Sequence, residues 1–461
     1  MNENELFAIC PLDGRYKSRS RSLEKTFSEA ALITYRVKVE ILWFKRLCLE
    51  SVGNLKPPDE KLEKQLDLWI SQFSVDDVKE IKSIEKEINH DVKAVEYFLK
   101  RRAKESGNTF LKSHVEMFHF GCTSEDINNL AYAGMLRDAR KKILVPKLDS
   151  LIDILKQLIL NGASLAMVSR THGQPASPTT LGKELANYRS RIRLSRDHFL
   201  DVKILGKLNG AVGNFNAHVV ADSKKNWLEI SRSFVEEDLG LIVNEMTTQI
   251  EPHDWIARYS NELVVVNSIM LDFCRDIWSY ISLGYFTQKK EKNEVGSSTM
   301  PHKVNPIDFE NAEGNFGLSS SLLQHFSTKL LVSRYQRDLS DSTVMRNIGV
   351  AVGYTLLALD STVRGLKKIV PNKVKISSDL TDTWEVLSEP IQMVMRKNGI
   401  ADAYERLKEI SRGESLGRDQ VYLFITNLDI SKEDKEALLS LLPSRYVGLA
   451  EELAIKEAEK D

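Results

Sequence analysis

Residues 263–280 read LVVVNSIMLDFCRDIWSY, and apolar side chains recur along them at steps of three and four. This seam consists of Leu263, Val266, Met270, Phe273, Ile277 and Tyr280. Such steps return to one face of an α-helix, so the spacing predicts a long helix with a single apolar face. The same spacing recurs at positions 148, 151, 155 and 158 and at 352, 356, 359, 363 and 366. Helices of this kind suit packing in a bundle, although ordinary core helices show the same pattern.

Proline placement agrees with long helices. No proline lies between Pro178 and Pro252, between Pro252 and Pro301, or between Pro306 and Pro371. Because a proline inside a helix costs about 3 kcal/mol, these spans can remain helical. We find neither a convincing alternation typical of strands nor a fixed internal repeat, which disfavours a solenoid. We therefore expect a mostly helical protein, and helices with this much apolar surface favour a homo-oligomer.

The composition is ordinary for a soluble globular protein of 461 residues, with 42% hydrophobic and 28% charged residues. Lys+Arg 64 against Asp+Glu 65 leaves a net charge of -1, which argues against a nucleic-acid or acidic-membrane partner. The N-terminal residues lack the features of a secretory signal, and the apolar stretches are too short and interrupted to span a bilayer. The four cysteines are far apart and form no CxxC pair, so we expect a reduced, cytoplasmic setting.

A polar segment between two prolines, residues 296–306, reads GSSTMPHKVNP. It carries small hydroxyl residues, a cation and an amide on one short stretch. Gly296 and Pro301 interrupt a continuous helix, so the segment is expected to be a loop. This chemistry suits a mobile loop that closes over a substrate with carboxylate groups.

A second segment, residues 171–178, reads THGQPASP and predicts a rigid turn that presents His172. An imidazole has an unperturbed pKa of about 6.5, which suits proton transfer near neutral pH. A structural loop histidine is the alternative. His114 and His119 are five positions apart, which on a helix gives poor geometry for sharing a metal.

Other polar segments allow two interpretations each. Residues 121–129, GCTSEDINN, have the composition of a helix N-terminus, where Thr123 or Ser124 would cap the helix and could also bind an anion. Residues 89–93, NHDVK, could be a solvated helix face. The arginines near residues 15, 337 and 346 could recognise phosphate or carboxylate, or could lie on exposed helices.

Segments 121–129, 171–178 and 296–306 resemble the three signatures of the aspartase/fumarase superfamily. The resemblance begins at residues 13–16, DGRY, and extends into the C-terminal region. With His302 between Pro301 and Lys303, and with NHD at 89–91, the chain is similar to the bacterial branch that cleaves succinylated purine nucleotides. The resemblance implies an all-α, three-domain fold whose long central helices assemble in a homotetramer with shared active sites. The implied domains are N-terminal 1–112, central 113–365 and C-terminal 366–461.

The resemblance also implies an activity: a carbon–nitrogen lyase that releases fumarate from adenylosuccinate, giving AMP, and from succinylaminoimidazole-carboxamide ribotide (SAICAR), giving the carboxamide ribotide (AICAR). Ser297 would be the general base and His172 the general acid. The implied substrate-binding residues are Arg15, Tyr16, Asn89, His90, Asp91, Thr123, Ser124, Gln249, Ser298, Lys303, Val304, Asn305, Asn311, Arg337, Ser342, Thr343, Val344, Met345 and Arg346.

No cofactor or metal is expected, because the sequence has neither a Gly-rich dinucleotide fingerprint nor a phosphate-binding P-loop. The nearest competing functions are those of fumarase, aspartase and argininosuccinate lyase. A non-catalytic homologue, like some lens crystallins, would not need Ser297, His172 and Lys303 together. A helical scaffold would explain the helices but not the polar loop.

Overall fold

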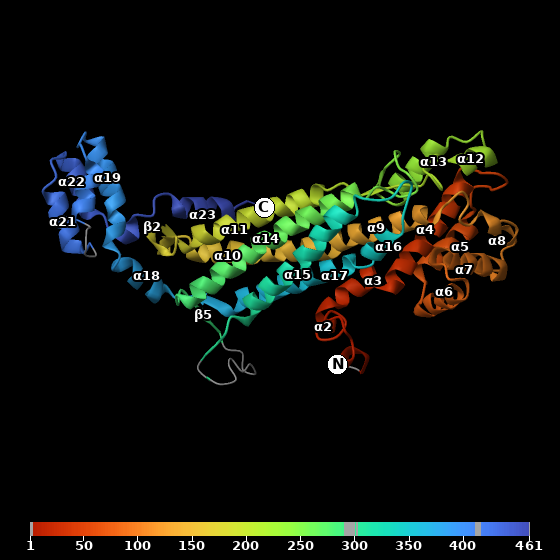
Figure 1. Ribbon diagram of the computed structural model, residues 1–461, viewed down its shortest axis with the longest axis horizontal. Coiled ribbons are helices and arrows are strands. Elements are labelled where there is room, and N and C mark those ends of the chain that lie inside the picture. Colours follow the sequence, from red (N-terminus) through yellow and green to blue (C-terminus); the bar gives the residue numbers. More distant parts are fainter. Residues whose placement is uncertain (1–2, 290–299, 301–302, 411–415, 461) are drawn as a thin grey trace. The chain divides into compact units, whose positions relative to one another are not determined.

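The computed structural model describes residues 3–289, 300, 303–410 and 416–460. The chain forms two compact units, each built from segments that are distant in sequence (Figure 1). Unit 1 contains Met1–Lys147, Ser195–Ser268 and Asn315–Ala358, and unit 2 contains Leu148–Leu194, Ile269–Gly314 and Leu359–Asp461. The division into three domains at residues 112 and 365 remains a prediction.

Among the described residues, five long helices contribute residues to both units: α10 Val145–Gly162, α11 Leu181–Asp201, α14 Asp254–Ser282, α15 Ile307–Lys329 and α17 Ile348–Lys368. The helices predicted from the three apolar seams are therefore confirmed as parts of α10, α14 and α17. In α14, the seam residues from Leu263 to Ile277 are at most 1% exposed. Tyr280 is half-buried and its hydroxyl donates to Glu184 Oε2 at 3.0 Å.

Other α-helices lie wholly within unit 1. They are α1 Glu3–Leu6, α2 Lys17–Ser20, α3 Glu24–Phe27, α4 Glu29–Leu49, α5 Glu60–Ser71, α6 Val75–Ile88, α7 Asp91–Glu105, α8 Thr109–Ser113, α9 Ser124–Ala139, α12 Asn216–Ala221, α13 Trp227–Ser233 and α16 Ser340–Met345. Helix α4 begins where Ser28 Oγ accepts from the Ala31 N–H at 3.1 Å, an N-cap that satisfies a free backbone donor. It packs against α5, α7 and α9 (Figure 1), so residues on α4 can contact several helices at once.

The C-terminal helices of unit 2 are α18 Lys373–Thr381, α19 Ser388–Lys397, α20 Ala403–Ile410, α21 Arg418–Thr426, α22 Lys432–Ser440 and α23 Ala450–Ala458. Helices α19 to α22 surround a small apolar core of their own. Its buried members include Ile391, Met395, Leu407, Val421 and Ile425.

In the described part of the chain, three two-stranded sheets interrupt the helices. Strands β1 Ala166–Thr171 and β2 Gln174–Thr180 are antiparallel, β3 Leu205–Gly206 and β4 Ile242–Val243 are parallel, and β5 Phe286–Gln288 and β6 Ile369–Pro371 are antiparallel. Most of these strands are too short to show alternation, and β2 contains two prolines. The fold remains essentially helical, as predicted.

One stretch of the described helices, Ser340–Lys368, is long and apolar enough to cross a membrane by length and composition. This corrects the expectation that every apolar stretch is too short. However, 56% of its most apolar window is buried within the protein. A buried core helix passes the same test, so the stretch is weak evidence for a membrane span.

Candidate functional site

A cavity of about 620 Å³ in unit 1 brings many of the predicted substrate-binding residues together. Its walls come from the junction between α6 and α7, the first turns of α9, and α16 with its flanking residues. The lining consists of Glu85, Asn89, His90, Asp91, Ser124, Asn128, Arg337, Leu339, Ser342, Thr343, Arg346 and Asn347. Segments separated by about two hundred residues in sequence therefore share one polar cavity.

The α6–α7 junction turns sharply at Asn89, whose φ of 52° and ψ of 40° lie in the left-handed region that asparagine tolerates well. His90 then caps α7, because its Nδ1 accepts from the Lys93 N–H at 3.1 Å. In the neutral ring the proton is consequently on Nε2. These residues lie at a helix junction, which differs from the solvated helix face considered as the alternative.

Asp91 is the first residue of α7 and carries a partly buried negative charge, with its side chain 26% exposed. Burial by itself raises the pKa of its carboxyl group, but three donors outweigh burial and lower the pKa below the usual 3.8. They are Arg36 Nη2 at 2.7 Å, the Val92 N–H at 2.9 Å and Arg346 Nη2 at 3.1 Å. Asp91 is therefore an anion that fixes two arginines beside the cavity.

The first turn of α9 is held by a buried ion pair. Thr123 is the N-cap residue of α9, and its N–H donates to Asp126 Oδ2 at 2.8 Å. Asp126 Oδ1 lies 2.9 Å from Lys207 Nζ, and both side chains are fully buried. The same oxygen accepts from the backbone N–H groups of Asn209 and Gly210 at 3.0 and 3.3 Å. The ion pair fixes Thr123 against residues 207–210.

Two arginines, Arg337 and Arg346, line the cavity beside the carboxylates of Glu85 and Asp91. Arg337 Nη2 lies 2.9 Å from Glu125 Oε1, and the Arg337 side chain is 18% exposed. Arg346 lies 3.1 Å from Glu29 as well as from Asp91, and its side chain is 41% exposed. Planar guanidinium groups bind the oxygens of phosphate or carboxylate in pairs, so the cavity suits an anionic ligand.

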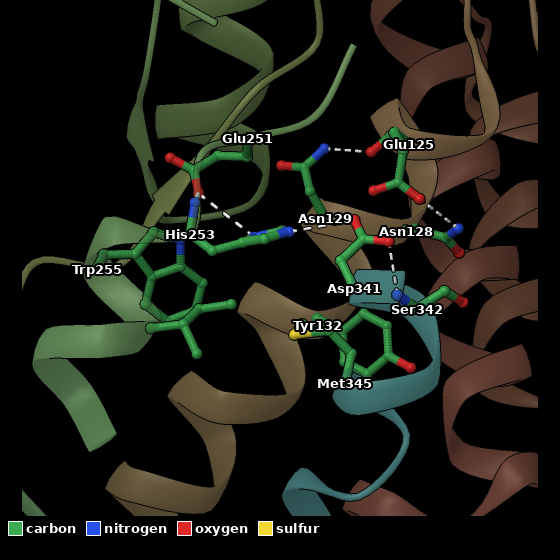
Figure 2. Close-up of a pocket in the computed structure, with 11 residues that line it drawn as sticks. Glu125, Asn128, Asn129, Tyr132, Glu251, His253, Trp255, Asp341, Ser342 and Met345 are labelled. Carbon is green, nitrogen blue, oxygen red and sulfur yellow. Dashed lines mark hydrogen bonds and ion pairs between the residues drawn. The ribbon is translucent and has the colours of Figure 1, made fainter. Parts of the chain in front are cut away.

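A small polar chamber of about 10 Å³ supports α16, with Ser342 and Asn128 shared between it and the larger cavity. Figure 2 shows His253 between Glu251 and Asp341 in this chamber. His253 Nε2 lies 3.5 Å from Asp341 Oδ2, and Asp341 Oδ1 accepts from the Ser342 N–H at 2.6 Å. Burial raises the pKa of Asp341, but His253 and the charge of Arg337 outweigh burial and lower it. The chamber thus fixes the start of α16.

The remaining predicted residues of unit 1 lie outside the lining of the larger cavity. Gln249 Nε2 donates to the Ala211 carbonyl at 3.0 Å. Arg15 precedes α2 with its guanidinium 5.8 Å from the centre of the Tyr16 ring. Val344 belongs to α16, and Met345 lines the small chamber instead. Thr123 is adjacent to the lining residue Ser124.

In unit 2, His172 lies at the tip of the β1–β2 hairpin. His172 and Gly173 form the two-residue connection, with φ of 53° and 77°. Positive φ at both positions is typical of a type I′ turn, whose twist matches that of the paired strands. The turn predicted from residues 171–178 is present, and it leaves His172 exposed.

Ser297, Ser298 and His302 lie outside the described residues. Beside them, the Lys303 N–H donates to the Met300 carbonyl at 3.0 Å, and Gln288 Nε2 donates to the Val304 carbonyl at 2.8 Å. Asn305 precedes α15, and Asn311 within α15 accepts from Ser361 Oγ at 2.6 Å. The described ends of the loop are therefore anchored to β5 and, through α15, to α17.

The described part of the chain contains no group of three or more His, Cys, Asp and Glu residues arranged to hold a metal ion. Sequence reasoning missed Arg36, Lys207, Glu251, His253 and Asp341. None of these residues belongs to a recognised motif. Their hydrogen bonds and ion pairs in the folded structure identify them as parts of the site.

The chain is similar to known proteins along nearly its whole length. A lyase family model matches residues 14–317, and a model of the adenylosuccinate lyase C-terminal region matches residues 333–447. The chain is 50% identical over 454 residues to an adenylosuccinate lyase of Legionella pneumophila (strain Corby), covering 98% of this chain and 99% of that protein. It is 47% identical over 451 residues to an adenylosuccinate lyase of Escherichia coli (strain K12), covering 98% of each.

The fold has relatives among solved structures. A fumarate lyase from Mesorhizobium sp. BNC1 superposes with a TM-score of 0.76 at 16% identity, covering 96% of this chain and 98% of that chain. A 3-carboxy-cis,cis-muconate lactonizing enzyme from Pseudomonas putida superposes with a TM-score of 0.72 at 19% identity, covering 95% and 96%. These two likenesses concern the fold alone. The matches along nearly the whole sequence show that the chain belongs to the adenylosuccinate lyase family.

Proposed function

We propose that the chain is a carbon–nitrogen lyase that eliminates fumarate from adenylosuccinate, giving AMP, and from SAICAR, giving AICAR. The observation that carries this proposal is the 45–50% identity to adenylosuccinate lyases along essentially the full length of this chain and of those relatives. The polar cavity of unit 1 supports it, because these substrates carry a phosphate and two carboxylates.

The cavity suits the anionic part of such a substrate. Arg337 and Arg346 present guanidinium groups, while Ser342 and Thr343 add hydroxyl donors from α16. We assign these residues, with Asn89, to binding of the phosphate or a carboxylate. Arg15, Tyr16, Gln249, Val344 and Met345 remain predicted contacts.

The chemical difficulty is the removal of a weakly acidic C–H proton next to a carboxylate. Negative charge accumulates on that carboxylate, so the site needs donors and a cation at that position. We assign Lys303, Asn305 and Thr123 to the carboxylates, with Ser298, Ser124 and Asn311 nearby in the same role. Each well-placed donor in such sites typically contributes about 2.7–4 kcal/mol to the transition state.

Proton transfer is assigned to two residues. Ser297 removes the proton, and its hydroxyl must be made more acidic by Lys303 and by backbone amides of the loop. His172 protonates the departing nitrogen. In the single chain its side chain is exposed at the hairpin tip, so a substrate can reach it. His90 orients the substrate or controls the protonation of His172. Closure of residues 296–306 over the substrate would exclude water and complete the site.

The assembly is proposed to be a homotetramer with shared active sites, in the cytoplasm, with small molecules as its only ligands. Apolar side chains on the long helices support the assembly: Val265, Trp278 and Leu318 are 46%, 44% and 54% exposed in the single chain. Light scattering on the purified protein tests this, and a monomer would contradict it.

The activity is tested by incubating the purified protein with adenylosuccinate and measuring fumarate. Malate, aspartate and argininosuccinate serve as the comparison substrates for other lyases of the superfamily. Release of fumarate from adenylosuccinate alone supports the proposal, whereas a correctly assembled protein that leaves adenylosuccinate intact refutes it.

The two proton-transfer assignments are tested separately. Ser297→Ala should retain substrate binding and lose turnover; near-normal turnover removes Ser297 as the base. His172→Ala should lose turnover while the assembly is unchanged. If both variants retain activity, the assigned roles are wrong even though the family is right.

A further inference from the structure

Arg36 is a buried arginine of α4 that does not line the cavity but holds two residues that do. Its side chain is 2% exposed. Its Nη2 donates to Asp91 Oδ2 at 2.7 Å, and its Nε donates to Asn128 Oδ1 at 2.9 Å. Asp91 begins α7 and Asn128 lies near the start of α9. One guanidinium group therefore fixes two of the helices that form the cavity wall.

The contacts continue from this guanidinium to both cavity arginines. Asn128 Nδ2 donates to Glu125 Oε1 at 2.9 Å, and Arg337 Nη2 lies 2.9 Å from the same oxygen. On the other side, Asp91 Oδ2 also accepts from Arg346 Nη2 at 3.1 Å. Hydrogen-bond donors and acceptors alternate along this row of contacts, which runs from Arg337 through Arg36 to Arg346. A displacement of Arg36 would therefore move both cavity arginines.

Stability does not explain an arginine at this position. An ion pair with a buried member contributes little net stability compared with well-packed apolar residues, because the buried charge loses its hydration. In addition, Arg36 Nη1 is buried without a hydrogen-bond partner among the residues that the structure describes. An unsatisfied buried donor destabilises the fold. The geometry that Arg36 imposes on its partners is the better explanation.

The charges explain why a second arginine is needed beside Asp91. An anion bound by Arg346 weakens the attraction between Arg346 and Asp91. Without Arg36, the partly buried Asp91 carboxylate would then lose most of its positive partners, which is unfavourable. With Arg36 at 2.7 Å, Asp91 remains neutralised while Arg346 engages the ligand.

We propose that Arg36 is a positioning residue of the nucleotide site. It sets the separation of Arg337 and Arg346 and leaves Arg346 available for an anionic group of the ligand. This inference rests on the proposed function, because the ligand is taken to be a purine nucleotide.

Arg36→Lys tests the role, with Arg46→Lys as the matched control. A lysine keeps the charge near Asp91, but a single ammonium group cannot hold Asp91 and Asn128 in the geometry of the guanidinium fork. Arg46 lies on the same helix, is 9% exposed, and pairs with Asp238 at 2.8 Å outside the cavity lining. The measurements are KM and kcat with adenylosuccinate, and the dissociation constant of AMP by calorimetry.

We expect Arg36→Lys to raise KM and the AMP dissociation constant by about tenfold, with kcat changed less than about threefold. Arg46→Lys should change each quantity less than about twofold. Arg36→Gln, which keeps an amide donor but no charge, should raise KM further. Melting temperature and gel filtration establish that each variant is folded and assembled.

The outcomes separate this inference from the proposed function. Unchanged KM and AMP affinity in the Arg36 variants, or changes equal to those of Arg46→Lys, overturn the positioning role. Loss of folding in both Arg36 variants assigns Arg36 a structural role and also overturns it. A wild-type protein that neither binds AMP nor cleaves adenylosuccinate refutes the proposed function, whereas an active wild type with unaffected Arg36 variants refutes only this inference.

Discussion

Replacing Lys207 by methionine removes one partner of the buried Lys207–Asp126 ion pair at the first turn of α9. Lys207 Nζ lies 2.9 Å from Asp126 Oδ1, and neither side chain has exposed surface. Methionine has a similar length and no charge, so the substitution isolates the electrostatic loss. Asp126 would keep its bonds from the N–H groups of Thr123, Asn209 and Gly210.

Removing one partner of a buried pair typically costs about 3–5 kcal/mol, because the other charge remains buried. The three backbone donors that remain place the expected loss near the lower end, at about 3 kcal/mol. A domain of roughly 150–250 residues loses about 2–4 °C in melting temperature per kcal/mol. We therefore expect Lys207→Met to lower the melting temperature by about 6–12 °C.

Lys142→Met is the control. Lys142 Nζ lies 2.8 Å from Asp138, nearly the same separation, but the lysine side chain is 69% exposed. An exposed pair contributes about 0–1 kcal/mol, so the control should lose at most about 4 °C. Thermal unfolding followed by far-ultraviolet circular dichroism measures both variants. A loss in Lys207→Met no larger than that in Lys142→Met would refute the reasoning.

Two further predictions concern the same region and the hairpin. Burial lowers the pKa of His119, but the charge of Glu40 and the hydrogen bond to it outweigh burial and raise the pKa above 6.5. A raised folded pKa stabilises the protein below pH 6.5, and this contribution is lost as pH rises through the folded value. His119→Gln should therefore lower the melting temperature more at about pH 6 than at about pH 9, and an equal loss at both contradicts the pairing. Gly121 and Gly173 both have positive φ, 71° and 77°. A Cβ atom added to Gly121 would lie 2.6 Å from His218 Cδ2, whereas a Cβ atom added to Gly173 would meet no described atom within 4 Å. Gly173→Ala should lower the free energy of unfolding by about 1 kcal/mol through backbone strain, and Gly121→Ala should lower it by at least about 2 kcal/mol through strain and overpacking. Equal losses of unfolding free energy would show that the His218 ring moves aside.

Features set by nearby residues could be predicted from the sequence. The helical seam from Leu263 to Ile277 and the absence of proline predicted α14, since helical hydrogen bonds join residues four apart. The composition around Thr123 predicted the start of α9. Glycine beside His172 predicted the turn, because positive φ is readily adopted by glycine.

Except for Glu251, the members of the site that sequence reasoning missed have partners far along the chain. Arg36 binds a residue 92 positions away, and the Lys207 N–H donates to Asn129 Oδ1, 78 positions away. His253 reaches Asp341 across 88 positions. A lone arginine or lysine inside a helical pattern has many possible partners, so no local signal distinguishes it from a surface residue.

The order of residues along this chain was sufficient to specify its helices, its caps and turns, and its family, because these depend on periodicity and on short motifs. It did not specify which charged side chains would be buried together. The packing of α4, α7, α9 and α16 decides which charged side chains pair. A buried charge is costly unless an opposite charge or a hydrogen-bonding group lies next to it in the folded protein. The cavity with Arg337 and Arg346 on its wall, and Arg36 behind it, exists only in that packed state.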